Sequence, residues 1–131
     1  MTQIYEFDPV IYPFRLWEAV NPSPDEIKEK FYGLTTDNER VEIQDDLNDC
    51  FKIATTTIVS DKKSGWVGCF VSIWKPKQMD VKTIAHEASH VADFISEQFG
   101  ITMDSFENGE AKAYLVGWAA DCIEKVKKGR F

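Results

Sequence analysis

The segment between Asp80 and Gly100 constrains the fold more than any other part of the chain. Its apolar residues recur at steps of four, three and four, which places them in one stripe along a helix: Ile84, Ala88, Val91 and Ile95. Asp80 is suited to cap the start of this helix, and Gly100 is suited to end it. Since one face of such a helix is apolar, the rest of the chain is expected to pack against it.

Two runs of branched and aromatic residues precede this helix and predict a β-hairpin. They span residues 51–59 and 66–74, with a polar turn between them. A second apolar stripe follows Gly100 and predicts a last helix from near Glu107 or Gly109 to about Lys128. The inward positions of this last helix are expected to be Ala111, Leu115, Trp118, Cys122 and Val126.

The first half of the chain gives weaker patterns. A short helix is expected to open at Ser23 or Pro24 and to end near Gly33, with Ile27 and Phe31 facing inward. Residues 10–20 are interpreted as a strand pair or as one irregular strand. The polar and acidic segment 35–49 has the weakest pattern and is interpreted as a loop with a helical turn.

These elements predict an α+β fold in a single domain over residues 1–131. A small antiparallel sheet is expected to pack on the Asp80–Gly100 helix and on the C-terminal helix. A chain of 131 residues with 44% hydrophobic residues can build such a core without disulfide bonds.

Charge and cysteine usage exclude several classes of function. The formal net charge is −7, and the Lys and Arg residues form no patch of the kind that binds nucleic acid. Three cysteines without a CxxC pair argue against a disulfide framework or a thiolate zinc site. Without a signal peptide or a long apolar segment, the protein is expected in the cytoplasm and away from membranes. The sequence leaves its oligomeric state open.

The only two histidines of the chain lie in His86-Glu87-Ala88-Ser89-His90. Residues four apart share one face of a helix, with Cβ atoms about 5–6 Å apart, so both imidazoles can bind one ion. The alternative is a helix that carries two polar histidines by chance. The apolar stripe excludes both residues, however, so packing does not require them.

A zinc ion at these histidines would lower the pKa of water to about 7 and polarise a carbonyl group. Glu87 would then act as the general base and pass the proton to the leaving amine. The sequence therefore predicts hydrolysis of an amide or peptide bond.

A catalytic zinc requires a third protein ligand. Asp93 lies seven residues after His86, which corresponds to about 10.5 Å of helix, so it is interpreted as orienting a ligand histidine or as a solvated carboxylate. Glu110, near the start of the last helix and beside its apolar stripe, is the preferred ligand. Glu107 and Asp104 are the alternatives.

Tyr114 follows Glu110 by one helical turn and shares its face. It is predicted either to donate a hydrogen bond to a ligand or to the developing oxyanion, or to pack its ring at the edge of the core.

These residues resemble the zincin metallopeptidases, and within them the gluzincin branch. The resemblance rests on the HExxH segment at 86–90 and on Glu110-Ala111-Lys112-Ala113-Tyr114, and it covers mainly residues 65–120. It implies zinc held by His86, His90 and Glu110, with Glu87 as the catalytic base. It also implies a sheet edge strand over the active-site helix that pairs with an extended substrate, a role expected of Trp66–Trp74.

The chain departs from the family pattern at several positions. Asp93 and Ser96 stand where the metzincin branch has Gly and His or Asp, and Tyr114 replaces the usual Asp one turn after the third ligand. A third histidine, which large gluzincins use to stabilise the oxyanion, is missing from the sequence.

These patterns are compatible with three functions. The leading one is a small zinc-dependent peptidase that cleaves an extended peptide or an unstructured protein segment. The second is a zinc-binding interaction module without hydrolytic activity, whose metal holds the two C-terminal helices together. The third is a partner-binding domain without metal, whose interface would use exposed aromatic residues: Tyr12, Trp17, Trp66 and Trp74.

Overall fold

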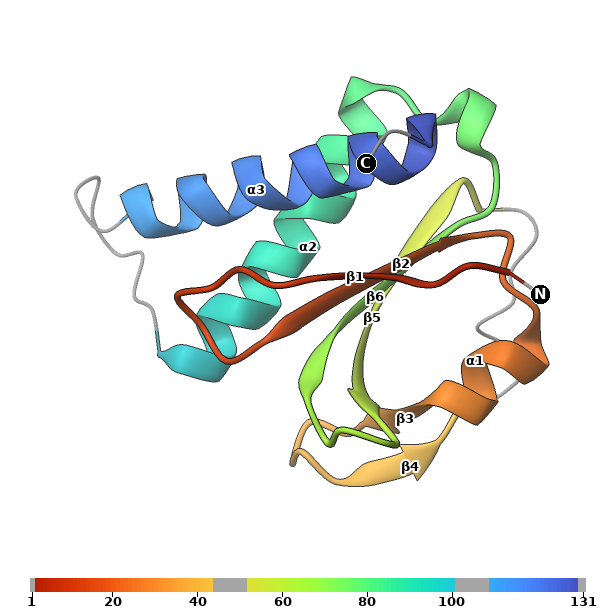
Figure 1. Cartoon of the computed structure of the whole chain (residues 1–131). Coiled ribbons are helices and arrows are strands. Elements are labelled where there is room, and N and C mark those ends of the chain that lie inside the picture. Colours follow the sequence, from red (N-terminus) through yellow and green to blue (C-terminus); the bar gives the residue numbers. More distant parts are fainter. Residues whose placement is uncertain (1, 44–51, 101–108, 130–131) are drawn as a thin grey trace.

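The computed structural model describes residues 2–43, 52–100 and 109–129 of the chain. It confirms the expected α+β class (Figure 1). The strands are β1 (Tyr5–Phe7), β2 (Arg15–Val20), β3 (Phe31–Leu34), β4 (Arg40–Glu42), β5 (Ala54–Asp61) and β6 (Val67–Ile73). The helices are α1 (Pro24–Lys30), α2 (Val81–Phe99) and α3 (Gly109–Lys128).

The strands form one sheet with the order β1-β2-β6-β5-β3-β4. The hairpin expected from the sequence is β5 paired with β6, in an antiparallel register that sets Thr56 opposite Val71. On its other side β6 pairs with β2, and this pairing is parallel. The prediction that Trp66–Trp74 forms an edge strand is therefore wrong, because β6 has a hydrogen-bonded partner along both sides.

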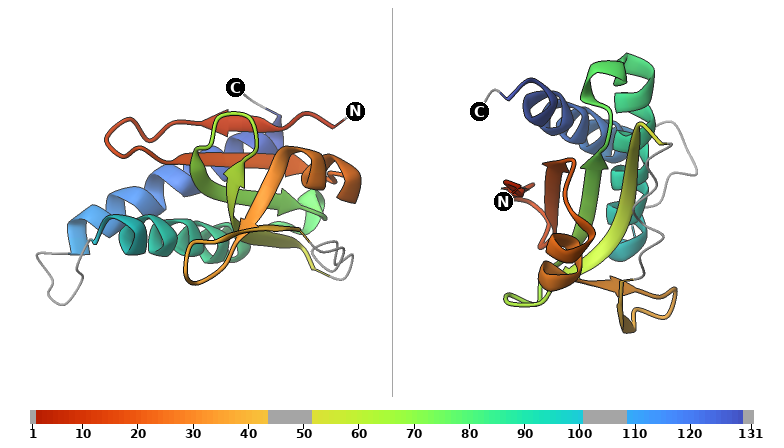
Figure 2. Two further views of the ribbon diagram at one scale, coloured as in Figure 1. Left: turned by 90° about the horizontal axis from the view of Figure 1, so that it is seen from below. Right: turned by 90° about the vertical axis from the view of Figure 1, so that its right-hand side faces the viewer.

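Helices α2 and α3 cover one face of the sheet, and α1 lies on the opposite face (Figures 1 and 2). The larger core fills the space between the sheet and the helix pair, and it includes Leu16, Val71, Val91 and Ile123. A second core lies under α1; its buried members are Trp17, Ala19, Ile27, Phe31, Ile43, Val59, Phe70 and Trp74. The sheet is thus the middle layer of three.

The ends of α2 follow the sequence expectation. The Asp80 carboxylate accepts a hydrogen bond from the backbone N–H of Thr83 at 2.9 Å, which satisfies a donor in the first turn. Gly100 ends the helix with φ of 65°, a left-handed conformation that glycine adopts without a steric cost. The predicted stripe of Ile84, Ala88, Val91 and Ile95 is buried in the larger core.

In the first half of the chain, tertiary contacts and not local sequence decide where the helix and the strands begin and end. Ser23 caps α1 as expected, but the helix ends at Lys30, so Phe31 is buried from strand β3 and not from the helix. Residues 40–42, which were expected within a loop, instead form the edge strand β4, because they pair with β3. Within the part of the chain that the structure describes, no helix is both long and apolar enough to cross a membrane.

Candidate metal centre

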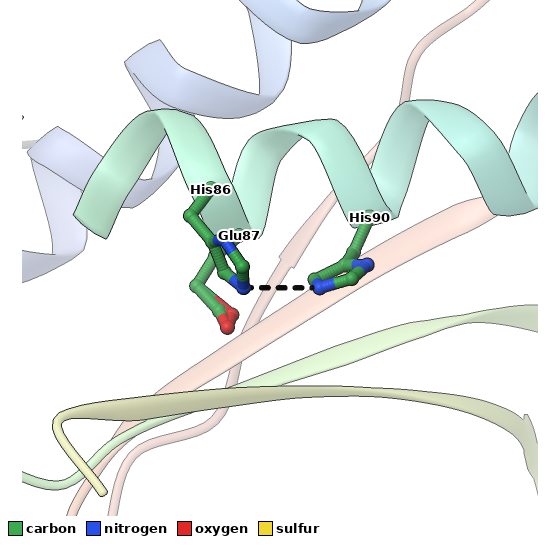
Figure 3. Close-up of side chains that lie close together, drawn as sticks. All are labelled: His86, Glu87 and His90. Carbon is green, nitrogen blue, oxygen red and sulfur yellow. Dashed lines mark hydrogen bonds between the residues drawn. The ribbon is translucent and has the colours of Figure 1, made fainter. Parts of the chain in front are cut away.

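The two histidines of α2 turn their rings toward one another on the exposed side of the helix (Figure 3). Their Nε2 atoms are 3.2 Å apart. Two nitrogen ligands at 2.0–2.1 Å from a tetrahedral zinc ion are separated by about 3.3 Å. The observed separation therefore suits two ligands of one ion, and neither ring has to move far to bind it.

Glu87 lies between the two histidines in sequence but points toward the sheet (Figure 3). It is only 5% exposed, and one of its carboxylate oxygens accepts a hydrogen bond from the Thr56 hydroxyl of β5 at 3.1 Å. One ligand-type atom from each of His86, Glu87 and His90 lies within 4.8 Å of the others. The helix spacing alone produces this group, since all three residues come from consecutive turns of α2.

The environment of Glu87 favours its protonated form more than water would. Burial raises the pKa of its carboxyl group above the usual value, and this effect outweighs those that lower the pKa. The lowering effects are the hydrogen bond from Thr56 and the charges of His90, His86 and Lys52. A carboxyl group with a raised pKa suits a general base that holds and then releases a proton.

Strand β5 leaves part of its outer edge open beside this group. Strand β3 pairs only with Val59, Ser60 and Asp61, so in the described part of the chain no strand pairs with residues 54–58 on that side. On the side of β5 that faces β6, the Ile53 carbonyl accepts a hydrogen bond from the Trp74 N–H, and the Asp61 N–H donates one to the Trp66 carbonyl. Because backbone groups alternate in direction along a strand, those of residues 54, 56 and 58 point to the open edge.

Glu110 and Tyr114 lie elsewhere in the structure. Glu110 is exposed in the first turn of α3, and it is not a member of the histidine group. The buried residues of α3 are Leu115, Ala119, Cys122, Ile123 and Val126. The predicted inward positions Leu115, Cys122 and Val126 are confirmed, whereas Ala111 and Trp118 are only partly buried. Glu110 lies on the opposite side of the helix from the buried residues, and the expectation that it borders a buried cleft is wrong.

Tyr114 shares the exposed face of Glu110, and its side chain is 76% exposed. Among the described residues it has no hydrogen-bond partner. Packing at the core edge is therefore excluded for Tyr114, and its proposed contact with an oxyanion stays a prediction.

Asp93 forms an ion pair with Lys112 of α3, with 2.7 Å between the carboxylate oxygen and Nζ. This contact joins the first turn of α3 to α2 about one turn beyond His90, on the face of α2 that Asp93 shares with His86. The alternative ligands Glu107 and Asp104 lie outside the described residues.

Sequence reasoning missed three side chains near the histidines: Thr56, Lys52 and Lys82. Thr56 holds the Glu87 carboxylate, and both lysines line the cavity beside His86. The alternation of β5 could have placed Thr56 on the helix-facing side, but no local signal connects it to Glu87, 31 positions later.

The aromatic residues considered for a partner interface are mostly internal. Trp17 is fully buried, Trp74 is buried, and Tyr12 stacks on Phe99 with 5.3 Å between the ring centroids. Trp66 is the exception, because it is exposed and carries the Arg15 guanidinium over its ring.

Comparison with known proteins adds no assignment: no family model, curated protein or solved structure matches the chain.

Proposed function

We propose that this protein is a zinc-dependent hydrolase, a small metallopeptidase that cleaves a peptide bond in an extended substrate. The 3.2 Å separation of the His86 and His90 Nε2 atoms carries the proposal, because it fits two ligands of one zinc ion. A pair of imidazole nitrogens favours zinc over calcium or magnesium, which prefer oxygen ligands.

Zinc, when bound, supplies a Lewis acid that activates water and polarises the substrate carbonyl. The chain's own residues would do the rest. The His86 and His90 rings offer Nε2 to the metal. The Glu87 carboxylate takes a proton from the attacking water and delivers it to the leaving amine. The Thr56 hydroxyl fixes the orientation of that carboxylate through its hydrogen bond.

The open edge of β5 is the proposed platform for substrate. A peptide added there would pair with the backbone of Ala54, Thr56 and Ile58 as an additional strand. Since Thr56 also bonds Glu87, a bond of that peptide would lie beside the carboxylate and the two rings. This role belongs to β5 and not to β6, on which the sequence placed it.

One observation favours a second candidate, a zinc-binding interaction module without hydrolytic activity. The Glu87 carboxylate is close enough to both rings to be a metal ligand itself. It would then complete a three-residue site within α2 and would not be available as a base. The two candidates differ in what Glu87 does, and a conservative variant separates them.

The first test measures metal content. The purified protein is expected to hold about one zinc per chain, and His86→Ala is expected to lose it because one imidazole alone binds weakly. Glu97→Ala, an exposed change on the same helix, is the matched control and should keep the metal. Undiminished zinc in His86→Ala would rule out the site. Glu110→Ala in the same assay tests the predicted third ligand.

The second test is Glu87→Gln. The amide cannot accept the proton, so peptide cleavage is expected to fall by at least about a hundredfold while zinc content stays at the level of the unchanged protein. Loss of zinc together with activity would instead identify Glu87 as a ligand. Retained cleavage with bound zinc would mean that another residue is the base.

A further inference from the structure

A cavity of about 410 Å³ adjoins the histidine group at the end of the molecule where β5 and α2 both begin. Lys52, Ile53 and Ala54 line it from the strand. Lys82, Thr83, His86 and Glu87 line it from the helix. His86 and Glu87 therefore belong both to the cavity lining and to the proposed site. A substrate bound at His86 would reach this cavity.

The charge of this cavity differs from that of the whole chain. The protein has 22 acidic and 15 basic residues, yet apart from Glu87 the acid-base residues of the lining are Lys52, Lys82 and His86. Both lysines are exposed, and neither forms an ion pair with an acid in the described part of the chain. Asp80, the nearest acid along the helix, is engaged as the cap of α2. Among the described residues, two ammonium groups without an ion pair therefore line one cavity.

The open edge of β5 sets the direction in which a substrate would run. Antiparallel pairing is slightly more stable per residue than parallel pairing. A peptide that pairs antiparallel with residues 54–58 passes from Ile58 toward Ala54. Its C-terminal part, which follows the bond beside Glu87, therefore lies at Lys52 and Lys82.

On these grounds we infer that the cavity is a subsite for a carboxylate carried by the substrate on the C-terminal side of the cleaved bond. The inference rests on the proposed peptidase function and names its substrate class. The carboxylate belongs either to an Asp or Glu side chain or to the free C-terminus of a short peptide. Both present the same anion to Lys52 and Lys82.

The test uses a set of labelled peptides that differ only after the cleaved bond. One position carries Glu, Gln or Lys, and each peptide is made with a free and with an amidated C-terminus. The Glu peptide is expected to have a five- to tenfold higher kcat/KM than the Gln peptide, mainly through KM, because two lysines contribute a modest attraction each. The advantage should shrink at high salt.

The two carboxylate sources separate within the same set. A preference that follows the side chain and survives amidation identifies an acidic residue. A preference that follows the free C-terminus and ignores the side chain identifies a peptidase that removes a short C-terminal segment. Equal kcat/KM for all six peptides overturns the inference.

Charge reversal assigns the effect to the two lysines. Lys52→Glu together with Lys82→Glu is expected to abolish the preference for Glu and to favour the Lys peptide, with the Gln peptide little changed. Lys63→Glu, an exposed change in the turn at the far end of β5, should keep the original preference. An unchanged preference in the double variant overturns the assignment, and its melting temperature verifies that it is folded.

Binding distinguishes failure of this inference from failure of the proposed function. Fluorescence anisotropy with the zinc-loaded Glu87→Gln protein measures affinity for the Glu and Gln peptides without cleavage. If no peptide is hydrolysed but the Glu peptide binds five- to tenfold more tightly, the peptidase proposal fails and the carboxylate subsite stands. Equal affinity for the Glu and Gln peptides, each with a free and with an amidated C-terminus, overturns the subsite, whatever the outcome for hydrolysis.

Discussion

Glu18 is the one fully buried acid of the sheet, and its side chain faces the helix pair from β2. In the described part of the chain neither carboxylate oxygen has a hydrogen-bond partner. Burial raises the pKa of Glu18 to about 9, so the folded protein holds this side chain as the neutral acid at neutral pH. Cys122 of α3 lies close enough for the Glu18 charge to add to the effect of burial, which raises the thiol pKa to about 12.

This carboxyl group should make folding pH-dependent. In the unfolded chain Glu18 ionises near pH 4.5, whereas in the folded chain it keeps its proton to about pH 9. The free energy of unfolding is therefore expected to fall as pH rises through this window, by up to about 1.4 kcal/mol per pH unit. Glu18→Gln, which does not titrate, should flatten the decline and be the more stable protein at pH 8.

Denaturant unfolding at pH 5, 6.5 and 8 measures this difference. Glu29→Gln, a change at an exposed position of α1, serves as the control and should leave the slope as it is. Equal slopes for Glu18→Gln and the unchanged protein would show that Glu18 ionises normally in the fold.

The pairing of strand β6 with β2 depends on a single residue, Gly68. Gly68 is paired with Arg15 of β2 in the parallel register, and it has no room for a side chain. A Cβ atom there would overlap the Arg15 carbonyl oxygen and lie 2.6 Å from the Trp17 ring. The close approach of β2 and β6, which fixes the centre of the sheet, therefore requires glycine.

Gly68→Ala is expected to lower the free energy of unfolding by about 3 kcal/mol, because the backbone of β2 cannot move aside without breaking its pairing. Gly117→Ala is the matched control. Gly117 lies within α3 with no atom in the way of a Cβ, so alanine there should stabilise the protein by up to about 1 kcal/mol. Thermal unfolding of both variants gives the comparison. A stable Gly68→Ala would show that the two strands separate more easily than their register suggests.

Local elements were the most predictable from sequence. The start, stripe and end of α2 depend on residues within one helix, and Asp80, Ala88 and Gly100 each took the expected place. The hairpin of β5 and β6 was predicted for the same reason, since its strands are joined by a short turn. α3 was located correctly, and Leu115, Cys122 and Val126 of its predicted stripe are buried. Ala119 and Ile123 were not predicted as buried, because the neighbouring helix decides which flank of the stripe is covered.

At the level of the whole molecule, the parallel pairing of β2 with β6 organises the fold. It joins segments about fifty positions apart and turns β6 into an interior strand. The open edge then falls on β5, next to Glu87. It also gives α2 and α3 a continuous face of the sheet to cover (Figure 2). The histidine group, the strand edge and the lysine-lined cavity meet only because of this arrangement.

The sequence by itself determined the candidate metal ligands of α2 and the class of the fold. A spacing of four residues on a helix brings His86 and His90 together wherever the helix lies, since helical geometry is local. Only the tertiary structure decided which strand faces them, that Thr56 holds Glu87, and that Glu110 lies apart from the two rings. These relations depend on how helices and strands distant in sequence pack together. The sequence around each contacting residue carries no local signal of that packing.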